Sequence, residues 1–314
     1  MRKLRIIPDG TNFSFMRFRR WSFPFSAALS VVTMLLFFGV GMNFGIDFEG
    51  GTLLEMQSRS GEANIAAVRQ AATGFNVGDV EVQEFGSGGG VSLRFPVQAG
   101  GEAGQQAVVQ KARDTFEKDY EFRRVETVGP RVSGELVQSG TVGIILAIVA
   151  VLIYLWFRFE WEFAVGAVIA TLHDLVLTMG FFVVTQIEFN MTSIAAILTI
   201  VGYSLNDTVV VFDRIRELLR RYKAMPVEEL LDLSINTMLA RTVMVSFTTF
   251  LALLALVMFG GSAIEGFSLA MLFGVVVGTY SSIFIAAPVL IYLGLKLGAA
   301  SPAHVGHVVA QPAE

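Results

Sequence analysis

Six apolar stretches, each about 18 or more residues long, constrain what this chain can fold into. A hydrocarbon core about 30 Å thick is crossed by about 20 residues of α-helix, so each stretch is long enough to span a bilayer. Only 16% of the 314 residues are charged, whereas soluble domains have about 25%. The sequence predicts a polytopic α-helical membrane protein whose transmembrane helices lie near 23–45, 137–157, 163–184, 191–212, 242–259 and 267–293.

Residues 46–136, between the first and second apolar stretches, have the composition of a soluble domain. Their periodicity and turn residues predict strand, helix, strand, strand, helix and strand. This order is the split βαβ, ferredoxin-like motif, and about 80 residues are enough for one small core. We expect these elements at 51–57, 62–73, 79–85, 91–97, 102–118 and 121–128, with a glycine-rich hairpin at 86–90.

The basic residues predict the topology. Outside the soluble insert, Lys and Arg occur only in 1–22, at Arg158, in the expected 213–241 loop and in the 294–314 tail. The positive-inside rule therefore makes both termini cytoplasmic and puts the insert on the opposite side. The first stretch could also be a secretory signal. It is longer than signal cores of about 7–15 residues and lacks an Ala-x-Ala site, so we expect an uncleaved span.

Asp207 lies near the end of the 191–212 stretch, where a carboxylate costs about 2.5–3.5 kcal/mol on insertion scales. Arg241, which opens the next stretch, is the basic residue placed to pair with it. A carboxylate whose protonation makes and breaks this pair could load and release a proton. A fixed ion pair that only joins two helices is the alternative. Three hydrogen-bonding residues are expected to support Asp207: Ser204, Asn206 and Thr208.

His173 and Asp174 form a second ionisable pair, in the middle of the 163–184 stretch. Ionisable residues at this depth indicate function by default. Adjacent residues of a helix point about 100° apart, so the two cannot both face one partner squarely. The sequence leaves a proton pathway and a structural polar contact between helices equally open.

Two linkers join the insert to the spans. Gly50 and Gly51 precede its first strand, and Gly129 and Pro130 follow its last. We expect both linkers to act as hinges, with a simple turn between helix and strand as the alternative. Ser133 is expected to cap the second span.

Nothing in the sequence indicates an enzyme. It has no Walker loop, no Gly-x-Gly-x-x-Gly opening a helix, no Cys and no clustered His. We therefore expect no cofactor, no metal site and no nucleic-acid partner.

Five motifs carry a resemblance to a known family. They are Gly45-Ile-Asp-Phe-Glu-Gly-Gly51, Val128-Gly-Pro130, His173-Asp174, Gly202-Tyr-Ser-Leu-Asn-Asp-Thr-Val-Val-Val-Phe-Asp-Arg-Ile-Arg-Glu217 and Arg241 after Asn236-Thr-Met-Leu-Ala240. These motifs resemble the SecF family, the accessory subunits of the bacterial Sec translocon within the RND superfamily. The resemblance implies a six-span half of an RND-type bundle, completed by SecD in the inner membrane, with the insert in the periplasm. It also implies that the proton-motive force is used to assist exported preproteins through SecYEG, with Asp207 and Arg241 at the family's proton-transport positions. In the family, the other essential carboxylate lies in SecD.

Two other functions remain open. An RND-type transporter of small or lipid-like molecules normally has two large inserts and twelve spans in one chain, so the single small insert argues against it. A purely structural scaffold for the translocon would tolerate loss of the intramembrane charges. In every case membrane lipid surrounds the chain.

Overall fold

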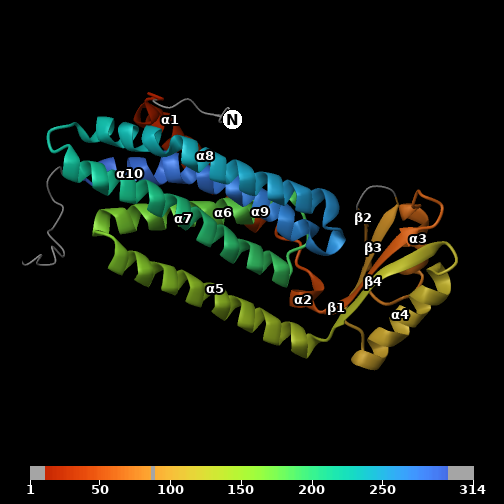
Figure 1. Ribbon diagram of the computed structural model, residues 1–314. Helices are drawn as coiled ribbons and strands as arrows, with labels where there is room; N and C mark the ends of the chain where they lie inside the picture. Colours follow the sequence, from red (N-terminus) through yellow and green to blue (C-terminus); the bar gives the residue numbers. More distant parts are fainter. Residues whose placement is uncertain (1–10, 86–88, 296–314) are drawn as a thin grey trace, which may run out of the picture.

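The computed structural model describes residues 11–85 and 89–295. Within them, a small sheet with two helices lies beyond one end of a helical bundle, and α5 leads from the sheet back along the bundle (Figure 1). Six helices in the described part are long and apolar enough to cross a membrane, which confirms the predicted number of spans. They are α1 (Arg19–Gly39, preceded by the 3₁₀ turn η1, Phe15–Phe18), α5 (Pro130–Arg158), α6 (Trp161–Thr185), α7 (Met191–Arg221), α8 (Val227–Phe259) and α9 (Ser262–Ser281), which continues through the π-helical turn η2 (Ser282–Ala286) into α10 (Ala287–Tyr292).

The segment 213–241, expected as a connecting loop, is mostly helical. α7 runs on to Arg221 and α8 begins at Val227, so only 222–226 lie outside a helix. The extensions are amphipathic, with charges on one face and buried apolar residues such as Ile215 and Leu231 on the other. A consequence is that Arg241 lies in the middle of α8 rather than at its start.

Both linkers next to the insert also differ from expectation. α1 ends at Gly39, earlier than expected, and the chain then pairs with the α6–α7 connection through a β-bridge between Phe44 and Phe189. α5 begins earlier than expected, with Pro130 in its first turn and Gly129 as the capping residue. Ser133 therefore does not cap this helix, and its hydroxyl instead donates to the carbonyl oxygen of Pro130 at 3.1 Å.

The insert follows the split βαβ order that the sequence predicts. The strand order is β2-β3-β1-β4, and all neighbouring strands are antiparallel. The two helices pack on one face of the sheet through a buried core that includes Leu54, Leu93, Val108 and Phe116. Part of the expected hairpin at 86–90 lies outside the described residues. The elements are α2 (Ile46–Glu49), β1 (Gly51–Ser58), α3 (Ile65–Thr73), β2 (Glu81–Phe85), β3 (Gly90–Phe95), α4 (Glu102–Phe116) and β4 (Tyr120–Val128).

The six spans form two groups that differ in burial. Between 44% and 61% of the most apolar window is buried in α6, α7 and the last span, against 11–17% in α1, α5 and α8. Close packing within the inner group depends on glycine, because a Cβ at Gly274 of α9 would overlap the Ile200 side chain of α7. The inner helices α6 and α7 also carry His173, Asp174 and Asp207.

Candidate functional site

Asp174 of α6 is the most deeply buried acid in the bundle, with 1% of its surface exposed. Its Oδ1 lies 2.9 Å from Nδ1 of His173, the preceding residue. Its Oδ2 accepts hydrogen bonds from Ser281 of α9, at 2.7 Å, and from Ser204 of α7. Three inner helices therefore meet at one carboxylate, whose oxygens are both satisfied as a buried polar group requires.

His173 is buried beside this carboxylate and keeps one free ring nitrogen. Its Nε2 has no hydrogen-bond partner among the residues that the structure describes. The centroid of the imidazole lies 6.1 Å from the ring centroid of Tyr280. The hydroxyl oxygen of Tyr280 is 3.0 Å from the hydroxyl oxygen of Ser26 on α1. His173 and Asp174 thus contact each other, although adjacent residues of a helix diverge, and the histidine retains a nitrogen that can take or give a proton.

Asp207 of α7 is half-buried between α8 and the last span. Ser282 donates a hydrogen bond to its Oδ2 at 2.6 Å, and the Thr242 side chain of α8 is a second hydrogen-bonding partner. No basic side chain in the described ranges lies within the 4.0 Å of an ion pair. Arg241 is exposed and acts on the carboxylate only through longer-range attraction, so the expected direct pair is absent from this conformation.

The three residues expected to support Asp207 are not gathered around it. Ser204 contacts Asp174 instead, from one turn earlier on α7. Asn206 points to the outside of the bundle, and Thr208 is buried. The structure therefore connects α7 to both acids but assigns the hydroxyl partners of Asp207 to other helices.

Ser281 and Ser282 are site residues that the sequence analysis missed. They are adjacent, yet Ser281 binds Asp174 and Ser282 binds Asp207. Ser282 is also the first residue of η2, and π-helical turns are rare and occur often at functional sites. A signal was present, because residues 279–282 are four hydroxyl-bearing residues in a row inside an apolar span.

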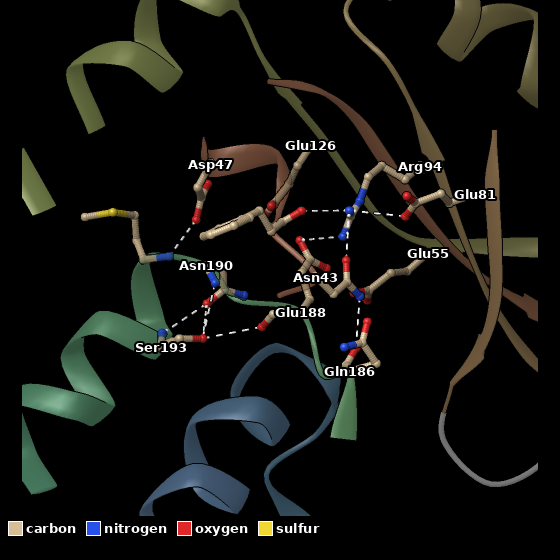
Figure 2. Close-up of polar contacts among 12 residues, drawn as sticks. Asn43, Asp47, Glu55, Glu81, Arg94, Glu126, Gln186, Glu188, Asn190 and Ser193 are labelled. Atoms are coloured by element: carbon tan, nitrogen blue, oxygen red, sulfur yellow. Dashed lines mark hydrogen bonds and ion pairs between the residues drawn. The ribbon is translucent and has the colours of Figure 1, made fainter. Parts of the chain in front are cut away.

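A second polar cluster joins the insert to the membrane helices, and Figure 2 shows it. Its centre is Arg94 of β3. The guanidinium donates to the carbonyl oxygen of Phe44 at 2.7 Å and to Oδ1 of Asn43 at 3.1 Å, and it pairs with Glu81 at 3.2 Å. It also lies 3.6 Å from Glu188, in the α6–α7 connection. The Arg94 side chain thus contacts both the segment that follows α1 and the segment that precedes α7.

Asp47 and Gly45 hold the start of α7 at this junction. Oδ2 of Asp47 accepts a hydrogen bond from the backbone N–H of Met191, the first residue of α7, at 2.9 Å (Figure 2). An acidic side chain at the N-terminus of a helix stabilises that helix by about 0.3–1 kcal/mol. A Cβ at Gly45 would overlap the Glu188 carboxylate. Burial raises the pKa of the Glu188 carboxyl above its ordinary value, against the opposing effect of nearby Arg94 and Arg124.

The two expected hinges differ in their packing. Gly50 and Gly51 have φ angles of +75° and +121°, and a Cβ at Gly51 would overlap the carbonyl oxygen of Phe95. Gly129 has an ordinary φ and open space around it, and Pro130 begins α5. The first linker therefore needs glycine for close contact with the sheet, whereas the second does not.

The chain matches known proteins along most of its length. Residues 108–296 match the family described as "Protein export membrane protein SecD/SecF, C-terminal", and residues 35–61 match the "SecD/SecF GG Motif". The chain is 42% identical to protein translocase subunit SecF of Rickettsia bellii, over 91% of this chain and 95% of that protein. It is 41% identical to SecF of Cereibacter sphaeroides, over 94% of each.

Fused relatives are longer. The chain is 45% identical to protein translocase subunit SecDF of Brucella abortus over 94% of its own length, but it spans only 39% of that protein. The crystal structure of SecDF from Thermus thermophilus, described as a translocon-associated membrane protein, superposes with a TM-score of 0.83 at 31% identity. That match covers 92% of this chain and 39% of the solved one.

Proposed function

Because this chain belongs to the SecD/SecF family of protein export membrane proteins, we propose that it is the SecF-type subunit that assists preprotein translocation. It acts with a SecD partner and the SecYEG channel in the inner membrane of a bacterium. Both termini are cytoplasmic, and the insert reaches the exported preprotein in the periplasm. Similarity to SecF subunits over nearly their full length supports this assignment, and nothing among the matches favours a small-molecule transporter.

The observation that carries the proposal is the environment of Asp207. The ionised carboxylate accepts hydroxyl hydrogen bonds and forms no ion pair with a basic residue of the described ranges, whereas the protonated form must itself donate a hydrogen bond. Uptake of a proton therefore changes the contacts between α7, α8 and the last span. Moving one charge across 100 mV supplies about 2.3 kcal/mol, enough to shift a two-state equilibrium roughly fifty-fold.

Arg241 and the buried pair of α6 complete the proposed proton pathway. Arg241 approaches Asp207 in a second conformation, since it already attracts the carboxylate from the neighbouring helix. Asp174 and His173 supply a further proton-binding group, because the carboxylate is hydrogen bonded to both α7 and α9 and the imidazole has an open nitrogen. The path is completed by the SecD partner.

The junction around Arg94 passes the change in the spans to the insert. Asp47 is bonded to the first residue of α7, and Arg94 ties the sheet to the connection before that helix. A movement of α7 therefore changes the contacts that hold the sheet. In this proposal the insert moves about the linkers at Gly50–Gly51 and Gly129–Pro130.

The test replaces Asp207 by Asn in membrane vesicles that contain the partner subunits. We expect proton-driven stimulation of preprotein export to be lost while co-purification with SecD is kept. Asp114→Asn, the same chemical change on an exposed residue of α4, should leave both unchanged. An Asp207→Asn variant with the wild-type export rate would favour the scaffold instead.

A further inference from the structure

An open cavity of about 530 Å³ lies where α5 ends and α7 reaches its last turns. Every residue that lines it is charged, with four arginines and two acids. It begins at Asp213, about 9 Å along α7 from Asp207, and plays no part in the proposed proton pathway. The lining residues are Arg158, Asp213, Arg216, Glu217, Arg220 and Arg221.

Both acids of the cavity already have basic partners. Arg158 donates to the two oxygens of Asp213 at 2.8 and 2.6 Å, and Arg214, outside the cavity, pairs with Glu217 at 2.7 Å. Arg220 and Arg221 are exposed, and neither has an ion-pair partner within the described part of the chain. The cavity therefore presents two unneutralised guanidinium groups, and guanidinium matches the geometry of phosphate oxygens.

An aromatic ring holds the wall of the cavity in place. The guanidinium groups of Arg158 and Arg216 lie 4.9 and 5.7 Å from the ring centroid of Phe159. Phe159 is buried and packs against Phe163 and Phe212 of the inner helices. Arg158 and Arg216 are thus held against a buried part of the bundle and form one wall of the cavity.

Exposed aromatic residues next to the cavity indicate that it lies at the depth of the lipid headgroups. Trp156 and Phe157, just before Arg158, are 74% and 84% exposed, and Trp161 begins α6 with 56% exposed. Tryptophan at the end of a spanning helix is typical of the membrane interface. A small apolar groove of about 20 Å³, lined in part by Val151, Leu152 and Val168, lies about 10 Å back along α5 from Arg158.

From this arrangement we propose that the cavity binds the headgroup of an anionic phospholipid. The phosphate oxygens contact Arg220 and Arg221, and an acyl chain runs along the exposed apolar face of α5, which includes Leu152, Ile153 and Trp156. A free phosphate ester would use the arginines alone, whereas the exposed tryptophans and this apolar face fit the rest of a lipid molecule. The bound lipid holds the ends of α5 and α7 at one leaflet, so that movement of these helices occurs about this end.

The chain offers a direct reporter, because two of its three tryptophans lie beside the cavity. In a Trp21→Phe background, Trp156 and Trp161 report quenching by brominated acyl chains. The full chain is reconstituted in phosphatidylcholine vesicles that contain a small fraction of brominated phosphatidylglycerol. We expect quenching to show roughly twenty-five-fold enrichment of the anionic lipid over random mixing, since each of the two arginines near an anionic surface strengthens binding about fivefold.

Arg220→Gln/Arg221→Gln should reduce the enrichment to random mixing. The matched control is Arg123→Gln/Arg131→Gln, which removes the same charge from exposed residues of β4 and the first turn of α5. It should leave the enrichment unchanged, and both proteins should keep the wild-type melting temperature. Random mixing in the wild type, or equal loss in both double variants, would overturn the proposal. If soluble glycerol phosphate displaces the brominated lipid, the ligand of the cavity is a free phosphate ester and the lipid proposal is wrong.

Discussion

The hydroxyl of Ser282 donates a 2.6 Å hydrogen bond to Oδ2 of Asp207. The preceding residue, Ser281, gives the same kind of bond to Asp174 at 2.7 Å. One short segment of the last span therefore contacts both Asp174 of α6 and Asp207 of α7. A change of protonation at either acid acts on the same stretch of backbone.

Replacing Ser282 by Ala should weaken proton-driven export without abolishing it. The variant loses a hydrogen bond to a charged group, which contributes about 1.5–3 kcal/mol, but Thr242 still contacts the carboxylate. Ser282→Thr keeps a hydroxyl and should restore most of the rate. Ser268→Ala is the control, because Ser268 is a buried serine of the same helix whose hydroxyl has no partner in the described residues. Export measured over a range of external pH checks this, and equal profiles for the two alanine variants would contradict it.

Replacing Arg241 by Gln should separate activity from stability. Arg241 is exposed and forms no ion pair in the described structure, so the free energy of unfolding should change by less than about 0.5 kcal/mol. Export stimulation should be lost, because in the proposed cycle Arg241 approaches Asp207 in a second conformation. Thermal unfolding and export assays on the same preparation test this. A large fall in melting temperature would mean that Arg241 holds this conformation instead.

Gly51→Ala should destabilise the insert, whereas Gly129→Ala should not. The added Cβ overlaps the carbonyl oxygen of Phe95 and occupies a backbone with φ of +121°, which costs on the order of 1–3 kcal/mol. At Gly129 the space is open and φ is −75°, so alanine should be neutral or stabilise by about 0.4–1 kcal/mol. Protease resistance of the insert at rising temperature compares the two. Equal resistance would show that the first linker can move away from the sheet at little cost.

Glu188→Gln should change how stability depends on pH. Burial raises the pKa of Glu188 in the folded protein above its ordinary value of 4.5. The folded state then binds more protons than the unfolded chain, so this stabilising contribution is full below pH 4.5 and lost as the pH rises through the folded pKa. Relative to the Gln variant, the wild-type melting temperature should therefore fall as the pH rises from that value. Glu117→Gln, at the exposed residue that follows α4, supplies the control, and a constant difference across the pH series would refute the prediction.

The elements of this fold were predictable because their signals are local. Hydropathy over about 20 residues identifies a span, and alternation around short turns identifies the strands of the insert. The end of α1 also has a local signal that the hydropathy of the segment hides. Gly41 has a φ of +81° and its backbone N–H donates to the carbonyl oxygen of Leu36 at 3.4 Å, which is typical of a helix that ends at glycine. The helical extensions around 213–241 were missed because an amphipathic helix outside the membrane has the polarity of a loop.

The candidate site could be predicted only in its charges. Asp174 and Asp207 are conspicuous because acids are rare in apolar spans. Their partners depend on how each helix is rotated. Of three polar residues of α7 that look equivalent in sequence, Ser204 contacts Asp174, Asn206 is exposed and Thr208 is buried. Likewise, the contact of Arg94 with Glu188 joins β3 to the α6–α7 connection, and no local pattern indicates it.

The π-helical turn at 282–286 contains one residue more per turn than the α-helix around it. If that surplus residue slides along the chain by a single position, each residue it passes rotates by about 100° about the helix axis. Ser281 and Ser282 sit at its upstream boundary. A shift of the π-helical turn by one residue would therefore change which of the two acids, Asp174 or Asp207, accepts a serine hydrogen bond, while the rest of the span keeps its position.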